Sequence, residues 1–152
     1  MSPDPLEGLT MFAKGVSAHR AGDRATAAQS FQKAAEAGHV EGYAALVQLA
    51  VDARDPAGEA HWARLGAEAG HPFCIARHGL LLLRSAMGRD DQERARVLLE
   101  QAAASGDVDS MVLAAHVNRE LGDLARSRHF AMMAQQTSNA TAIDSLRRYR
   151  LI

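Results

Sequence analysis

Large and small apolar residues alternate along the chain in a pattern that predicts a repeated series of short helices. In every second predicted helix, one position is always large and apolar, and the position before it is small. The large residues are Met11, Tyr43, Ile75, Met111 and Ile143, and the small ones are Thr10, Gly42, Cys74, Ser110 and Ala142. In the helices between them, Phe31, Trp62, Leu98 and Phe130 recur within a residue of one another. A large side chain beside a small one lets helices interdigitate, so we expect these positions to form the core.

Two sets of residues, aspartates and glycines, recur at the same intervals along the chain. Asp23, Asp55, Asp91 and Asp123 are separated by 32, 36 and 32 residues, and Gly38, Gly70, Gly106 and Ser138 each follow 15 residues later. An aspartate can cap the start of a helix, and a glycine can close its end. We therefore expect each aspartate to open a helix and each glycine, or Ser138, to close it. Gly88 favours placing the four extra residues of the longer interval in a loop at 87–90.

These signals predict an all-α protein built as an α-solenoid of antiparallel helix pairs. The helices are expected at 5–21, 24–37, 40–53, 57–69, 72–87, 92–105, 108–121, 124–137 and 140–149. They form a single domain over 1–152, with four units at 6–38, 40–70, 72–106 and 108–138 and a C-terminal capping helix at 140–149. The scarcity of aromatic residues, 5% of the chain, agrees with closely packed helices rather than strands.

Composition and charge narrow the possible partners and location. The 17 basic and 18 acidic residues leave a net charge of −1, which favours neither nucleic acid nor an anionic membrane. The longest apolar runs are far shorter than the roughly 20 residues of a membrane-spanning helix. One cysteine, Cys74, allows no intramolecular disulfide, and the first residues lack the pattern of a signal peptide. We therefore expect a cytoplasmic protein without membrane contact.

Parts of the sequence resemble two related repeat families. Gly15, Gly22-Asp23, Ala27, Phe31 and Ala34 resemble the tetratricopeptide signature. The run from Ala34 to Gly38, followed by the small Gly42, is similar to the junction of Sel1-like repeats. Gly79, Arg94-Ala95, Leu98-Leu99 and the run from Ala102 to Gly106 resemble the same repeat. The resemblance implies a right-handed superhelix.

The resemblance also implies a concave face, lined mostly by the first helix of each pair, that receives a protein or peptide. The positions expected on that face are Leu9, Phe12, Val16, Arg20, Gln48, Val51, Phe73, Leu80, Leu83, Arg84, Val112, His116 and Arg119. Apolar anchors with charged neighbours suit the capture of an amphipathic segment. We therefore expect a non-enzymatic scaffold or adaptor, although burial of the apolar residues between helices is an equal alternative for Phe12, Phe73, Leu80 and Leu83.

A second interpretation is a metal-linked regulatory protein or an enzyme. Cys74 and His78 lie four residues apart, close enough on one helix to share a metal with His71, and His116 could also take part in chemistry. Packing explains the same residues: Cys74 occupies the small position of the repeat, and His71 matches His39 in the preceding junction. No fourth ligand is evident, and no phosphate-binding loop or nucleophile motif is present. We therefore expect neither a metal, a cofactor nor catalysis.

The C-terminal segment leaves a third possibility open. Arg147, Arg148 and Arg150 are expected to complement the negative end of the last helix. The end formed by 141–152 could instead stack on a second copy, which would make the protein a self-associating adaptor. The oligomeric state expected from the sequence is therefore a monomer or a weak dimer.

Overall fold

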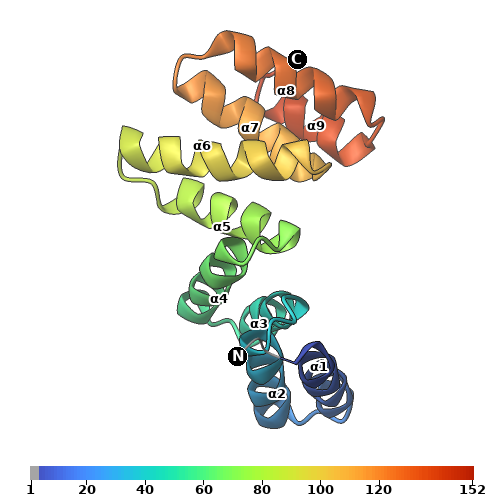
Figure 1. Ribbon diagram of the computed structural model, residues 1–152. Coiled ribbons are helices and arrows are strands. Elements are labelled where there is room, and N and C mark those ends of the chain that lie inside the picture. The colour runs from blue at the N-terminus through green and yellow to red at the C-terminus, as the bar shows by residue number, and fades with distance from the viewer. Residues whose placement is uncertain (1–3) are drawn as a thin grey trace. The chain divides into compact units, whose positions relative to one another are not determined.

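The computed structural model describes residues 4–152, and within them the chain forms nine α-helices and no strand (Figure 1). The helices are α1 (Pro5–Arg20), α2 (Arg24–Glu36), α3 (Glu41–Asp52), α4 (Pro56–Glu68), α5 (Pro72–Ser85), α6 (Arg89–Ala104), α7 (Val108–Glu120), α8 (Leu124–Gln136) and α9 (Ala140–Arg148). Every bound lies within three residues of the one predicted from the sequence. The all-α prediction is therefore confirmed.

The helices belong to two compact units, Met1–Cys74 and Ile75–Ile152, and α5 begins in the first unit and continues in the second. In the first unit α1 packs on α2, α2 on α3, and α3 on α4. In the second unit α6 packs on α7, α7 on α8, and α9 on both α7 and α8. Neighbours in sequence are thus neighbours in space within each unit, as in a helical-repeat protein. The single domain and the right-handed superhelix stay predictions.

Three of the four predicted aspartate caps are confirmed. The side chains of Asp23, Asp55 and Asp123 each accept a hydrogen bond of 3.0 Å from the backbone N–H three residues later. Each bond satisfies an amide that has no partner inside the helix. The caps explain why α2, α4 and α8 begin at equivalent points of the repeat.

The prediction for Asp91 is wrong, and so is part of the predicted loop at 87–90. The cap of α6 is Gly88, in an extended conformation, and the helix starts at Arg89. Asp91 lies in the first turn, where its Oδ2 accepts a hydrogen bond of 3.1 Å from the backbone N–H of Met87. Acidic residues in a first turn complement the positive end of the helix dipole. Most of the additional residues therefore lengthen α6, which has 16 residues where α4 has 13.

The junction between α2 and α3 shows how one repeat meets the next. Gly38 has φ +88°, and the N–H of His39 donates to the carbonyl of Ala34 at 2.9 Å, which closes α2. Gly42 lies against the backbone of α2, because a Cβ added there would be 2.5 Å from the carbonyl oxygen of Phe31. The predicted small position thus marks a close backbone approach. Ser138 adopts the same left-handed conformation as Gly38, with φ +56°.

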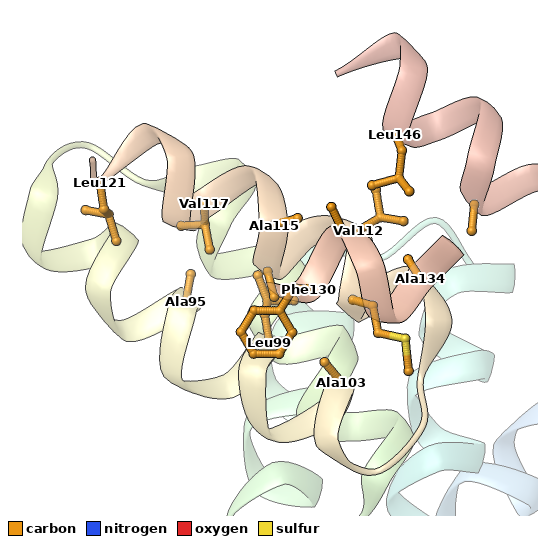
Figure 2. Packing of buried hydrophobic residues seen from close by; sticks show 14 residues of the cluster. Ala95, Leu99, Ala103, Val112, Ala115, Val117, Leu121, Phe130, Ala134 and Leu146 are labelled. Atoms are coloured by element: carbon orange, nitrogen blue, oxygen red, sulfur yellow. The ribbon is translucent and has the colours of Figure 1, made fainter. Parts of the chain in front are cut away.

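Each unit has its own hydrophobic core. In the first unit Ala27, Phe31 and Leu46 are buried, and half-buried residues of α1, α3 and α4 pack around them. The core of the second unit is larger and gathers side chains from α6, α7, α8 and α9 (Figure 2). Its members include Leu99, Val112, Val117, Phe130 and Leu146. Burying each large apolar side chain stabilises its unit by roughly 1.5–3 kcal/mol, which holds the surfaces described below in place.

Candidate binding site

The expected concave residues of α1 divide into exposed and packed members. Leu9 is 52% exposed, and Arg20 is exposed as well. Phe12 and Val16 are half-buried against the core of the first unit. The ring of Phe12 lies 5.4 Å from that of Phe31 and 4.7 Å from that of His39. Phe12 and Val16 therefore help to hold α1 on α2, and Leu9 and Arg20 are accessible to a partner.

The expected residues of α3 and α5 show the same division. Gln48 is exposed and donates a hydrogen bond of 2.9 Å to Asp52, and Val51 is half-buried. At the start of α5, Phe73 is 45% exposed. Leu80 and Leu83 are half-buried, Leu83 against the core of the second unit, and Arg84 is exposed.

The expected residues of α7 contact other parts of the chain itself. Val112 is only 3% exposed and belongs to the core of the second unit. The ring of His116 stacks on that of Tyr149, with centroids 4.7 Å apart. The guanidinium of Arg119 donates to the carbonyl oxygens of Tyr149 and Arg150 at 2.6 and 3.0 Å. His116 and Arg119 therefore hold the C-terminal end of α9, so they bind the chain's own C-terminal segment.

His71 and Cys74 take part in packing rather than forming an open metal site. The Nε2 of His71 lies 3.0 Å from a carboxylate oxygen of Glu41. Cys74 is fully buried against Gly66, and burial, with a contribution from the charge of Glu41, raises the pKa of its thiol to about 11. A protonated thiol is a poor metal ligand. In the part of the chain that the structure describes, no group of three or more His, Cys, Asp or Glu side chains could hold a metal ion.

A pocket of about 220 Å³ lies among α2, α3 and α4 of the first unit. Its walls are mostly apolar, and Arg24 and Asp55 add two charges. The lining residues are Arg24, Ala28, Leu46, Leu49, Ala50, Ala53, Asp55 and Trp62. Sequence reasoning assigned Trp62 to the core and overlooked this pocket.

Trp62 does not occupy the repeat position of Phe31. In the 32-residue spacing, Ala63 is the equivalent of Phe31, and Ala63 is fully buried. Trp62 comes one residue earlier, which turns its side chain by about 100° around the helix axis. It is half-buried at the edge of the core. Phe130 in the second unit also precedes the equivalent of Phe31, which is Ala131, by one residue, so the shift alone does not create the pocket.

The second unit shows what the same positions look like when the space is filled. The equivalents of Leu49, Ala53 and Trp62 there are Val117, Leu121 and Phe130, each 68 residues later, and all three are buried in the core. The small side chain of Ala53 therefore leaves room in the first unit that Leu121 occupies in the second.

Two other cavities lie near the C-terminal end of α2. One of about 460 Å³ is lined by Glu7, Met11, Lys33, Glu36 and Ala37, and one of about 260 Å³ by Pro5, Ala37, Gly38 and His39. Neither is lined by a Trp, Tyr or Phe side chain, and the walls of the larger one are about equally polar and apolar. The pocket beside Trp62, which we call the Trp62 pocket, is the better candidate for specific binding.

Comparison with known proteins places the fold. No protein-family model matches the chain, and no curated protein matches its sequence. Among solved structures, a Sel1 repeat protein from Oxalobacter formigenes is similar, with a TM-score of 0.66, 19% sequence identity and 91% of this chain covered. The chain spans 62% of the length of that protein. The fold is therefore that of a helical-repeat protein, similar to that of a Sel1 repeat protein. None of the helices in residues 4–152 combines the length and apolar character needed to cross a membrane.

Proposed function

We propose that this chain is a non-enzymatic binding module that captures a segment of another protein, with the Trp62 pocket as its main anchor site. The observation that carries the proposal is a largely apolar pocket lined by the half-buried Trp62. Tryptophan and arginine are enriched among the residues that dominate binding energy at protein interfaces. Both residue types line this pocket.

The size of the pocket supports a peptide side chain as its occupant. Its volume of about 220 Å³ is below the roughly 300–1,000 Å³ of pockets that hold cofactors or drug-sized molecules. A single leucine, methionine or aromatic side chain is a better match. Burying such a side chain would contribute roughly 1.5–3 kcal/mol, and neighbouring contacts would add the rest.

The proposal includes additional partner contacts at the exposed residues of the predicted concave face, taken for each unit separately. On the first unit these are Leu9, Arg20, Gln48 and Phe73, and on the second unit Arg84. Exposed apolar side chains such as Leu9 and Phe73 are suitable for additional contacts. A cytoplasmic location also belongs to the proposal, supported by the single cysteine of the sequence.

The test uses Trp62 itself, because it is the only tryptophan of the chain. Peptides selected against the protein from a phage-displayed random library would be titrated while the fluorescence of Trp62 is recorded. We expect binding to shift the emission. We also expect Ala53→Leu, which places the side chain of the second unit in the pocket, to weaken binding about tenfold or more, equivalent to about 1.4 kcal/mol.

The matched control is Ala21→Leu. Ala21 lies one repeat earlier at the equivalent helix end, is also exposed, and does not line the pocket. This variant should bind as the wild type does. If the selected peptides bind Ala53→Leu as tightly as the wild type, or if no peptide can be selected, the proposed function is wrong.

A further inference from the structure

The charged side chains around the Trp62 pocket differ in whether they already have hydrogen-bond or ion-pair partners within the chain. Arg24 and Asp55 line the pocket, and Arg54 lies between Ala53 and Asp55 in the sequence. All three are exposed. Their partners within the chain decide which charge remains available to a ligand.

The carboxylates near the pocket are occupied by the chain itself. Asp55 caps α4 by accepting a hydrogen bond of 3.0 Å from the N–H of Gly58. Asp23, next to Arg24, caps α2 in the same way, and the hydrogen bonds from Thr26 lower the pKa of its carboxyl. The positive ends of the two helix dipoles partly offset both negative charges. Asp52 accepts a hydrogen bond from Gln48.

The arginines, in contrast, have no partner within residues 4–152. The guanidinium groups of Arg24 and Arg54 form neither an ion pair nor a hydrogen bond there. Arg126, for comparison, pairs with both Glu100 and Asp123. An exposed guanidinium at the edge of an apolar pocket is suited to a carboxylate, which it can bind through two parallel hydrogen bonds.

From this asymmetry we infer that the segment bound at the Trp62 pocket is acidic. It places one large apolar side chain in the pocket and an aspartate or glutamate beside it, which pairs with Arg24, while Arg54 adds positive charge nearby. The inference rests on the proposed function and specifies the chemistry of the partner.

The experiment compares synthetic peptides that share one selected apolar anchor and differ only in the neighbouring residue, which is Glu, Gln or Lys. Affinities are measured through Trp62 fluorescence at low and at high salt. We expect the Glu peptide to bind about three- to tenfold more tightly than the Lys peptide, and salt to reduce the difference. Arg24→Glu should reverse the order of the two peptides.

The control variant is Lys14→Glu, which changes the net charge equally at an exposed position of α1 outside the pocket. It should preserve the preference for Glu. If the peptides still occupy the pocket, as judged by their sensitivity to Ala53→Leu, but show no preference or no reversal, this inference is wrong and the proposed function stands. If no peptide occupies the pocket, both are wrong.

Discussion

Replacing Gly42 with alanine tests whether the repeats depend on a close backbone approach at each junction. The added Cβ would be 2.5 Å from the carbonyl oxygen of Phe31 and 2.9 Å from the backbone nitrogen of Ala35. Both neighbours are backbone atoms of α2, so they cannot move aside by a rotamer change. The substitution therefore has to push α3 away from α2 and loosen the packing of the first unit.

The expected cost follows from two opposing terms. Overpacking a well-packed site costs about 1–3 kcal/mol, and a rigid backbone neighbour favours the upper part of that range. Alanine regains about 1 kcal/mol because it is the better helix former. We therefore expect Gly42→Ala to destabilise the first unit by about 1–2 kcal/mol. With a urea m-value of about 1 kcal/mol/M, the midpoint falls by about 1–2 M.

Urea unfolding followed by Trp62 fluorescence measures this change, because Trp62 lies in the first unit. The control is Gly79→Ala, followed by circular dichroism. A Cβ at Gly79 would meet side-chain atoms of Leu98 and Leu99 at 3.0–3.2 Å, so these atoms need to move by only a few tenths of an ångström, and the helix-forming gain offsets the contact. That variant should stay within about 1 kcal/mol of the wild type. A Gly42→Ala protein as stable as the wild type would refute the reasoning.

Two further predictions concern the second unit. Ser138→Gly should raise its melting temperature by a few degrees, because a residue with a side chain is strained at φ +56°, and a fall in thermal scanning would contradict this. Burial lowers the pKa of His116, with Arg119 adding to the effect and Glu120 opposing it. Since the folded pKa lies below the unfolded value of about 6.5, the stabilisation is complete above that pH and is lost as the pH falls through the folded pKa, by at most about 1.4 kcal/mol per pH unit. Thermal unfolding from pH 7 to pH 5 should show this loss as a fall in melting temperature. The variant His116→Phe, which retains an aromatic ring beside Tyr149, should lose less. If the melting temperatures of the variant and the wild type fall equally with pH, the assignment to His116 is wrong.

The helices could be predicted closely because their start and stop signals are local. An aspartate caps the N–H three residues away, and a glycine closes its own helix, so neither depends on distant residues. The prediction for Asp91 failed where spacing replaced local chemistry, since Gly88 preceded a run of acidic residues that prefers a first helical turn. The contacts of His116 and Arg119 with the C-terminal segment could not be predicted, because they depend on where α9 ends and where the chain returns onto α7.

The Trp62 pocket escaped prediction for a related reason. A repeat pattern reports what the copies share, and a shared apolar position indicates the core in every copy. A binding pocket arises instead where one copy departs from the others, because identical copies would fill or expose the same space. Ala53 is small where Leu121 is large, and Trp62 is half-buried where its equivalent Phe130 is buried. Each difference alone looks like ordinary variation, and only the packing of α2, α3 and α4 brings them to one pocket. The short side chain of Ala53 beside Trp62 is therefore the feature by which we expect the first unit to differ functionally from the second, and Ala53→Leu removes it with one substitution.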